Sequence, residues 1–260
     1  MNLPDEVRAA PRLAVITGAA GGLGAAIAAD LDKQGWATIR VDVRSPEADV
    51  DAGYAQPTVF LPLDVRDDAG FAQLGESLRM PRDRFLVVAA AGVISVGRAE
   101  NLSLAEWSRV IEVNLTGTFV TLRSMIAAAR EAETGRLIAI SSDAGKTGEP
   151  WLSHYSASKF GVIGLVQSLA LELVGHGVTV NAICPSIVDT PMMDQLARQM
   201  ADATGEADVQ EWRRRFVAEV PAGRACLPND VTNAVTFFAG EGSQFLTGQS
   251  LNVAGGHEMH

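Results

Sequence analysis

Short apolar runs alternate with longer helical segments along almost the whole chain. Between most of the short runs the apolar residues recur with helical periodicity, and this is clearest at 23–34, 104–130 and 155–174. The short runs have the length of strands and are too uniformly apolar for a sheet with one solvent-exposed face. They lie at 13–17, 37–43, 58–63, 85–90, 137–141, 178–183 and 250–253. This pattern predicts an α/β fold with a doubly wound parallel sheet.

Two segments interrupt the alternation. Residues 44–57 have the composition of a loop at a place where a crossover helix would fit, and residues 190–220 are a helical insertion rich in Met, Gln and Glu. An insertion beside the carboxyl ends of the strands is where a substrate lid would lie. Because no linker, repeat or low-complexity tract divides the chain, we expect a single domain over 1–260 with a lid at about 190–220.

Composition and charge exclude several classes of partner. The net charge of −10 argues against a nucleic-acid partner, because phosphate binding requires clustered Lys and Arg. No run approaches the roughly 20 apolar residues of a membrane span, and the first residues lack the order of a signal peptide. Two cysteines, Cys184 and Cys226, and four histidines show no metal-ligand spacing. We therefore expect a cytoplasmic protein without a catalytic metal or a membrane partner.

A glycine-rich turn follows the first predicted strand. The strand leads directly into Gly18-Ala19-Ala20-Gly21-Gly22-Leu23-Gly24, after which a helix begins. Any sharp turn can use glycines, but between a strand and a helix they allow the backbone to approach a pyrophosphate at the helix N-terminus. The segment therefore predicts dinucleotide binding through Gly18, Gly22, Leu23 and Gly24.

Asp42 ends the second predicted strand, at about the spacing from the glycines that is expected of a ribose-binding carboxylate. A carboxylate there accepts hydrogen bonds from the adenosine hydroxyls and repels a 2′-phosphate, which favours NAD over NADP. Arg44 lies two residues further on and could soften this discrimination. The alternative is that Asp42 only forms a turn at the strand end.

Tyr155 and Lys159 are four residues apart at the start of a predicted helix, so their side chains share one face. An isolated tyrosine has a pKa near 10, and a neighbouring ammonium lowers that pKa toward the range needed for proton transfer to an alcohol. The same spacing also fits an ordinary surface pair, so its meaning depends on the rest of the sequence.

The sequence resembles the classical short-chain dehydrogenase/reductase family over nearly its whole length, which implies a Rossmann-type doubly wound sheet. The family's TGxxxGxG pattern matches Thr17 to Gly24, and its YxxxK pattern matches Tyr155 and Lys159. The family's serine, thirteen residues before the tyrosine, falls on Ser142, and its helical asparagine falls on Asn114.

The resemblance implies a role for each catalytic match. Tyr155 exchanges the proton with the substrate oxygen, and Ser142 hydrogen-bonds that oxygen. Lys159 lowers the tyrosine pKa and binds the nicotinamide ribose, and Asn114 positions a water that links Lys159 to solvent. Outside the resemblance, Ser142 could be a helix cap and Asn114 a polar residue inside a helix, although Asn is a poor helix former.

Further cofactor contacts are implied by the same resemblance. Asp64 and Val65 follow the third strand, where the family contacts adenine, although a helix N-cap explains Asp64 equally well. The remaining implied contacts are Ala91, Gly92, Pro185, Val188 and Thr190. The chain departs from the family at three places, with Ala89-Ala90-Ala91-Gly92 in place of Asn-Asn-Ala-Gly, Ser186 in place of a glycine, and Ala254 in place of an acidic residue.

Substrate contacts are expected from loops after the fourth, fifth and sixth strands. The polar candidates are Ser95, Glu149, His154 and Ser186, and Trp151 and Met192 suggest an apolar wall, although each could be an ordinary loop residue.

The sequence thus predicts an enzyme that transfers a hydride between NAD(H) and a secondary alcohol or ketone, with a sugar alcohol or other small polyol as the leading small-molecule substrate. A 3-oxoacyl-[acyl-carrier-protein] reductase is the main alternative. Such an enzyme normally prefers NADP and needs a basic docking patch, and Asp42 and the net charge of −10 argue against both. A dinucleotide-sensing protein without turnover is a further alternative, but such relatives tend to lose the tyrosine or the lysine. The apolar segments 104–130 and 155–174 predict a homotetramer.

Overall fold

The computed structural model describes residues 3–45 and 53–260, and within them a single parallel sheet runs through the molecule. Its strand order is β3-β2-β1-β4-β5-β6-β7, with the order reversing between β1 and β4. This confirms the predicted Rossmann-type, doubly wound class. The strands are β1 Arg12–Thr17, β2 Ala37–Asp42, β3 Thr58–Pro62, β4 Arg82–Ala89, β5 Ala132–Ile140, β6 Val178–Pro185 and β7 Ser250–Val253.

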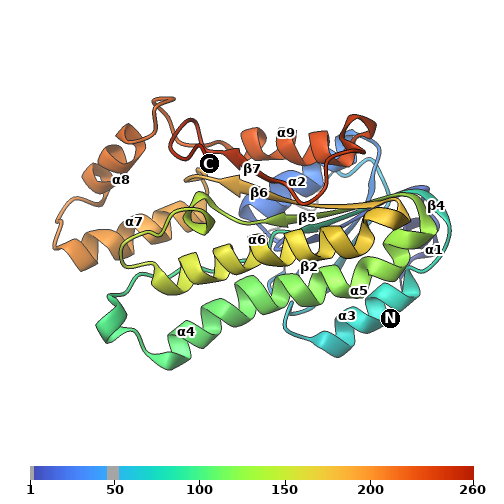
Figure 1. Cartoon of the computed structure of the whole chain (residues 1–260), viewed down its shortest axis with the longest axis horizontal. Helices are drawn as coiled ribbons and strands as arrows, with labels where there is room; N and C mark the ends of the chain where they lie inside the picture. The colour runs from blue at the N-terminus through green and yellow to red at the C-terminus, as the bar shows by residue number, and fades with distance from the viewer. Residues whose placement is uncertain (1–2, 46–52) are drawn as a thin grey trace.

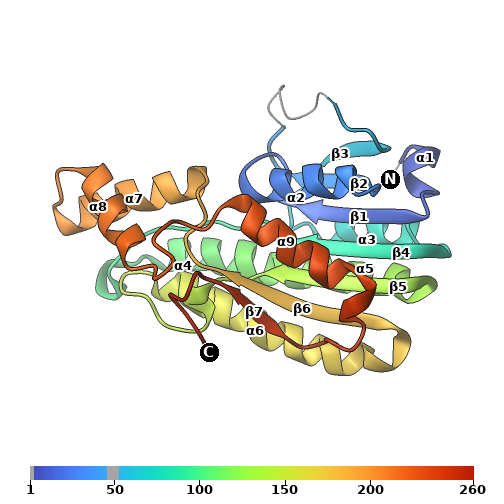
Figure 2. The ribbon, with the colours of Figure 1, turned by 90° about the horizontal axis from the view of Figure 1, so that it is seen from above.

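Helices cover both faces of the sheet (Figures 1 and 2). One face carries α3 (Asp68–Ser77), α5 (Gly117–Glu131) and α6 (Ser153–Leu173), and the other carries α2 (Gly22–Lys33) and α9 (Pro228–Ala239). Successive residues of β1 enter the two cores in turn. With both faces buried, the strands can be apolar at every position, which explains the missing alternation.

The segment 104–130 is helical throughout, as its periodicity predicts, but it is not α-helical at every residue. It contains α4 (Leu104–Ile111), a π-helical turn at Glu112–Thr116, and then α5. A π-helical turn replaces the usual i→i+4 backbone hydrogen bonds with i→i+5 bonds. Next to it, the hydroxyl of Thr118 donates a hydrogen bond to the carbonyl of Asn114 at 2.7 Å. Gly117 is needed after the turn, because a Cβ there would lie 2.5 Å from a methyl of Val65.

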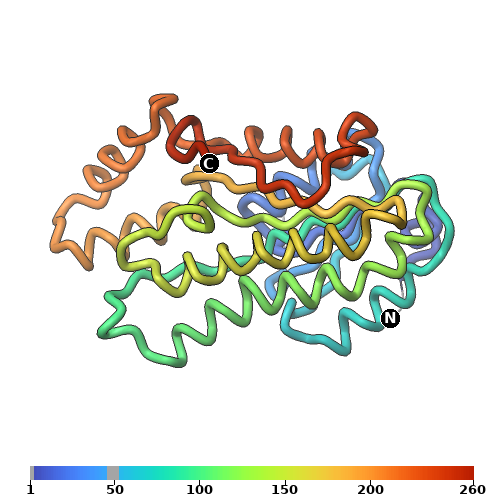
Figure 3. Tube along the Cα trace, viewed as in Figure 1, coloured from blue at the N-terminus to red at the C-terminus, as the bar shows by residue number. Residues whose placement is uncertain are grey.

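The insertion at 190–220 is helical, as predicted, and forms α7 (Pro191–Thr204) and α8 (Val209–Ala218). These helices lie beyond the carboxyl ends of the strands, as the orange helices of Figure 2 show. They bury a small core of their own that includes Met193, Leu196 and Trp212. The chain also ends at this side of the molecule (Figure 3).

Shorter elements complete the described part of the chain. They are α1 (Asp5–Arg8) and the one-turn helices Ala99–Asn101, Asp143–Gly145, Val174–His176 and Glu241–Ser243. The predicted loop at 44–57 falls partly outside the described residues, at 46–52.

One helix, Ser153–His176, is long and apolar enough to cross a membrane by length and composition alone. It contains α6, which packs against β6 as a core helix of the sheet, and such helices commonly meet the same criterion. It is therefore weak evidence for a membrane span.

The contact of α3 with α5 yields a prediction about folding. A Cβ added at Gly75 would lie 2.0 Å from the carbonyl oxygen of Ser124, so Gly75→Ala must push the two helices apart. We expect the free energy of unfolding in urea to fall by about 1–3 kcal/mol. Gly242→Ala, where a Cβ meets open space, is the matched control and should change it by less than about 0.5 kcal/mol. Equal effects of the two substitutions would contradict the close packing.

Candidate active site

The glycine-rich turn joins β1 to α2 at the edge where the strand order reverses. Gly18 and Gly22 have positive φ angles of 71° and 56°, and a Cβ on Gly24 would lie 2.2 Å from the carbonyl oxygen of Gly18. Helix α2 begins at this turn without a side-chain cap, so its first N–H groups point toward the turn. The turn therefore has the shape and polarity of an anion cradle.

The hydroxyl of Thr17 ties this turn to the loop after β4. It accepts hydrogen bonds from the backbone N–H groups of Ala90 and Ala91, each at 3.1 Å. Gly18 lies against the same loop, where a Cβ would be 2.9 Å from Ala91. Alanines replace the family's two asparagines in this loop. The loop is therefore held to Thr17 through its own backbone N–H groups.

Asp42 lies at the carboxyl end of β2, directly beside the turn, and is 8% exposed. Its carboxylate accepts hydrogen bonds from the N–H of Ala20 and from the N–H of Arg44, both at 3.0 Å. The exposed Arg44 guanidinium reaches back over the turn, 3.6 Å from the Asp42 carboxylate and near Gly21. The structure therefore places a fixed negative charge and a movable positive charge at one end of the cradle.

Asp64 and Val65 have different environments. The Asp64 carboxylate pairs with the side chain of Arg66 at 2.6 Å, and this contact lowers the pKa of Asp64. Val65 is buried against Gly117, next to the π-helical turn.

Tyr155 and Lys159 occupy the first turns of α6 and lie together, as their spacing predicts. The Lys159 ammonium donates to the carbonyl of Ile140 at 2.9 Å and lies 5.6 Å from the centre of the Tyr155 ring. Lys159 is nearly fully buried, and Tyr155 packs against the core of α7 and α8. The pair therefore stands at the end of β5, with Lys159 buried and Tyr155 partly buried.

The pKa values of this pair differ from the sequence expectation. Desolvation raises the pKa of Tyr155 to about 12, although a hydrogen bond with Ser142 opposes the rise. Desolvation also lowers the pKa of Lys159 to about 8. The predicted lowering of the tyrosine pKa is not found, because desolvation disfavours the charged form of both groups and the charge of Asp143 raises the pKa of Tyr155 further.

Ser142 begins the one-turn helix after β5 and is 8% exposed. Its hydroxyl donates to the carboxylate of Asp143 at 2.9 Å and accepts from the N–H of Ala144 at 3.2 Å. Ser142 is therefore both a local cap and a neighbour of Tyr155, so the two alternatives from the sequence are compatible.

Asn114 is fully buried in the π-helical turn. Its side-chain oxygen accepts from the N–H of Val93 at 2.8 Å, and its amide donates to the carbonyl of Val93 and to the hydroxyl of Ser158. Both Asn114 and Lys159 border Gly92. Asn114 thus clamps the loop after β4 against α6.

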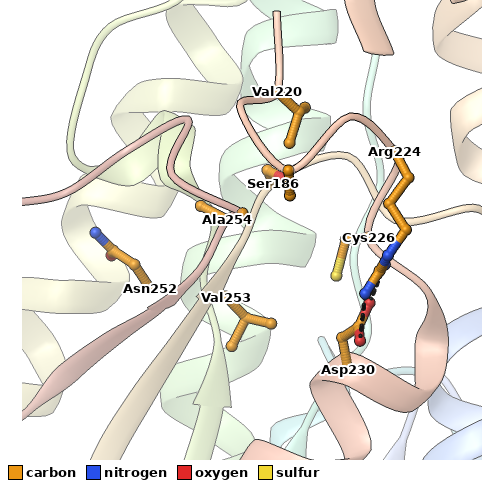
Figure 4. A pocket seen from close by; sticks show the side chains of 10 residues that line it. Ser186, Val220, Arg224, Cys226, Asp230, Asn252, Val253 and Ala254 are labelled. Atoms are coloured by element: carbon orange, nitrogen blue, oxygen red, sulfur yellow. Dashed lines mark hydrogen bonds and ion pairs between the residues drawn. The ribbon is translucent and has the colours of Figure 1, made fainter. Parts of the chain in front are cut away.

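The segment after β6 returns to the glycine-rich turn. The hydroxyl of Thr190 donates to the carbonyl of Val188. Thr190 also lies close to the turn, because a Cβ added to Gly22 would be 3.9 Å from the Cβ of Thr190. Next to it a cavity of about 240 Å³ lies between this segment and the ends of β6 and β7 (Figure 4). Ser186 and Cys226 line it, and the paired side chains of Arg224 and Asp230 form one wall.

The four polar substrate candidates do not share one position. His154 is fully buried, and its Nε2 bonds the hydroxyl of Ser95 at 2.7 Å, so His154 lies in the interior instead of on a cleft wall. Glu149 is half-buried, and the structure gives its carboxylate no hydrogen-bond partner among the described residues. Its pKa is raised by burial and then by the charge of Asp143.

Trp151 and Met192 are the two predicted apolar contacts. Trp151 has a φ of 63°, a strained value for a bulky residue, and its carbonyl accepts from the N–H of Gly97 at 2.9 Å. Met192 is 38% exposed at the start of α7. The strained backbone at Trp151 joins the loop after β5 to the loop after β4.

Two residues beside Ser142 were not predicted. Asp143 follows the serine directly, and His257 comes from the C-terminal segment, with its Nδ1 at 3.1 Å from the Asp143 carboxylate. Adjacency to Ser142 was an available signal for Asp143. A lone histidine near the chain end gives no such signal.

These residues fit a nicotinamide dinucleotide. The uncapped start of α2 and the positive-φ glycines suit a pyrophosphate, and the Asp42 carboxylate suits a ribose. In residues 3–45 and 53–260, no group of three or more His, Cys, Asp or Glu side chains is arranged to hold a metal ion.

Comparisons with known proteins agree with this fit. The chain matches the family model of the short chain dehydrogenases over residues 12–201. It is 32% identical over 247 residues to a 3-alpha-(or 20-beta)-hydroxysteroid dehydrogenase of Mycobacterium tuberculosis (strain ATCC 25618 / H37Rv), covering 94% of this chain and 88% of that protein.

Two solved structures are similar over nearly the whole chain. A variant of actinorhodin polyketide ketoreductase with NADPH has a TM-score of 0.84 at 32% identity, covering 96% of this chain and 98% of that one. NAD⁺-bound xylitol dehydrogenase has a TM-score of 0.86 at 25% identity, covering 95% and 98%.

The fold and the site define an oxidoreductase of alcohols and ketones that uses a nicotinamide dinucleotide. The chain belongs to the short-chain dehydrogenase family.

The buried Lys159 yields a prediction about stability and pH. Because its pKa is lowered to about 8 in the folded state, the unfolded chain binds more protons above that pH, and this residue's contribution to stability rises with pH. The free energy of unfolding of the wild type, minus that of Lys159→Met, should therefore increase by about 2–3 kcal/mol between about pH 8 and about pH 10. Urea unfolding of both proteins at the two pH values measures it. A difference that does not change with pH would show that Lys159 keeps its ordinary pKa.

Proposed function

We propose that this oxidoreductase uses NAD(H) and transfers a hydride between a secondary alcohol and its ketone, with a small polyol or sugar alcohol as the preferred substrate. The observation that supports the reaction most directly is the grouping of Tyr155, Ser142 and Lys159 at the end of β5, on the sheet edge that also carries the glycine-rich turn. Their chemistry matches the catalytic roles that the family resemblance implies.

In this proposal each side chain has one task. A bound nicotinamide dinucleotide supplies the hydride acceptor or donor. Tyr155 exchanges a proton with the substrate oxygen, Ser142 hydrogen-bonds that oxygen, and Lys159 holds a positive charge beneath the phenol. Since the pKa of Tyr155 is about 12, it carries its proton at neutral pH and is ready to give it to a ketone oxygen. Alcohol oxidation requires that this proton leave first.

The preference for NAD rests on Asp42. Two backbone N–H groups fix its carboxylate beside the cradle, where a 2′-phosphate would meet a like charge. Arg44 is largely exposed and can turn toward solvent, so it offsets this repulsion only in part. One of the two similar structures holds NADPH and the other NAD⁺, so the proposed preference rests on Asp42 and Arg44 of this chain.

The preference for a polyol rests on Glu149. A half-buried carboxylate without a hydrogen-bond partner among the described residues can accept hydrogen bonds from substrate hydroxyls. The similarity to a xylitol dehydrogenase supports this substrate class.

A 3-oxoacyl reductase is the second candidate, favoured by the similarity to a polyketide ketoreductase. A cavity of about 230 Å³ lined by Leu102, Leu104 and Trp107 could take an acyl chain. A dinucleotide sensor without turnover is less well supported, because Tyr155 and Lys159 are both present and adjacent.

We also propose that the chain is a single domain whose helices α7 and α8 act as a substrate lid, and that it works in the cytoplasm as a homotetramer. Exposed apolar side chains support the assembly, and they include Phe119 and Phe160 on the outer sides of α5 and α6, and Phe245 near β7.

The catalytic role is tested with Tyr155→Phe. We expect kcat to fall by about 10²–10⁴-fold with secondary alcohols and ketones, because the ring remains but the exchangeable proton is lost. Absorbance of the reduced nicotinamide measures turnover, and cofactor affinity by fluorescence should stay unchanged. Cofactor binding by the wild type without turnover on any alcohol, polyol or ketone would instead favour the sensor.

The cofactor preference is tested with Asp42→Asn, which keeps the shape of the side chain and removes its charge. We expect the ratio of kcat/KM for NAD over NADP to fall by about 10-fold or more, as for the loss of a charged hydrogen-bond acceptor. Arg44→Ala is the opposite variant and should raise the ratio. If Asp42→Asn leaves the ratio unchanged, another residue sets the preference.

A further inference from the structure

Three arginine side chains lie close together on one face of the sheet, toward the amino ends of the strands. Arg12 of β1 is paired in register with Arg84 of β4, and Arg136 of β5 is paired with the residue two positions after Arg84. Side chains alternate between the two faces of a strand. Two positions beyond the three arginines lie members of the core beneath α2 and α9, namely Ala14, Leu86 and Ile138. All three arginines therefore point to the face that α2 and α9 cover.

This cluster is remote from the dinucleotide cradle. The cradle lies at the carboxyl ends of the strands, whereas α9 runs over the sheet toward the amino ends, as Figure 2 shows. Arg136 precedes Ile140, whose carbonyl bonds Lys159, by four residues, and this corresponds to about 13 Å along a strand. A ligand bound by the arginines would therefore not share the position of the cofactor.

Arg136 is a buried cation with incomplete hydrogen bonding. The residue is 3% exposed, and its Nη1 donates to the carbonyl of Gly135 at 3.0 Å. Its Nε and Nη2 have no hydrogen-bond partner within residues 3–45 and 53–260. The hydroxyl of Thr179, which is in register with Arg136 on β6, is also buried without a partner in those residues. A buried charge is tolerated when an opposite charge or several hydrogen bonds compensate it.

The carboxylate that faces this cluster is that of Glu241, in the one-turn helix after α9, and it pairs with Arg84. The Arg12 guanidinium lies over the ring of Trp36, 4.8 Å from its centre. In the part of the chain that the structure describes, neither Arg12 nor Arg136 makes an ion pair. Burial, and then the charge of Arg84, lower the pKa of both. The cluster thus holds an excess of positive charge in a chain whose net charge is −10.

We propose that Arg84 and Arg136, together with the hydroxyl of Thr179, form a binding site for a small inorganic oxyanion such as phosphate, and that the Glu241 carboxylate competes with this anion for Arg84. A tetrahedral oxyanion offers several acceptor oxygens, which suit guanidinium N–H groups and a hydroxyl. The side chain of Glu241 is 70% exposed, so it can turn toward solvent and admit the anion. Because the guanidinium of Arg136 is buried, the site takes a free ion and excludes large phosphate esters.

The site is tested by calorimetric titration of the full chain with sodium phosphate, at an ionic strength held constant with sodium chloride. The dinucleotide cradle also suits phosphate groups, so it is first filled with saturating NADH or NADPH, whichever binds more tightly. We expect one phosphate to bind per chain. Arg84→Met and Arg136→Met should each weaken binding by about 10-fold or more, as expected for the loss of hydrogen bonds to a charged group.

Arg130→Met is the matched control, because it removes the same charge from an exposed position on α5. Its phosphate affinity should stay within about 2-fold of the wild type. Glu241→Gln keeps the shape of the side chain and removes the competing charge, so the affinity should rise by about 5-fold or more. A gain in affinity cannot result from misfolding, which keeps the test valid if an arginine variant is unstable.

Three results would each overturn the inference. The first is that the cofactor-saturated wild type binds no phosphate. The second is that Arg84→Met and Arg136→Met bind phosphate as tightly as Arg130→Met does. The third is that Glu241→Gln binds phosphate no more tightly than the wild type. None of these measurements requires turnover, so they are independent of the proposed reaction and substrate.

Discussion

The site depends on one tie between two neighbouring strands. The Thr17 hydroxyl accepts hydrogen bonds from Ala90 and Ala91, and this holds the turn after β1 against the loop after β4 at the point where the strand order reverses. In an open parallel sheet this point leaves a crevice, and ligands bind there. Gly18 is required because a Cβ would press on Ala91. This tie uses backbone N–H groups, so it forms without the asparagine side chains that Ala89 and Ala90 replace.

The strands, the helices and the fold class were predictable because they follow from apolar runs and their period, which are local properties. The catalytic roles of Asn114, Ser142, Tyr155 and Lys159 came from the resemblance to the family, and they stay predictions; the spacing of Tyr155 and Lys159 did predict that the two side chains lie together. The π-helical turn was not predictable, since 104–130 has the periodicity of one helix and the hydrogen bonds of Asn114 in that turn join it to distant segments. The contact of His257 with Asp143 was not predictable either, because it joins distant segments and depends on how α8 holds the chain end.

The pKa of Tyr155 shows where reasoning from spacing fails. Residues four apart on a helix do meet, and Lys159 does lie against the ring. Whether its charge stabilises a phenolate depends on what else the ammonium bonds and on how much water remains. Here it bonds the carbonyl of Ile140, and desolvation is the largest cause of the pKa shift of both groups. Burial is a tertiary property, so the sequence predicts the pair and leaves its protonation state open.

Helix α8 is in physical contact with the surroundings of both Tyr155 and His257. Tyr155 packs against the core of α7 and α8, and Phe216 of α8 also contacts His257. A displacement of α8 would therefore change two things together, the hydration of the phenol and the hold of His257 on Asp143. More water at Tyr155 would bring its pKa down toward the ordinary value. A looser His257 would raise the pKa of Asp143 and weaken its hold on the Ser142 hydroxyl. The pKa values of Tyr155 and Asp143 thus depend on the same helix.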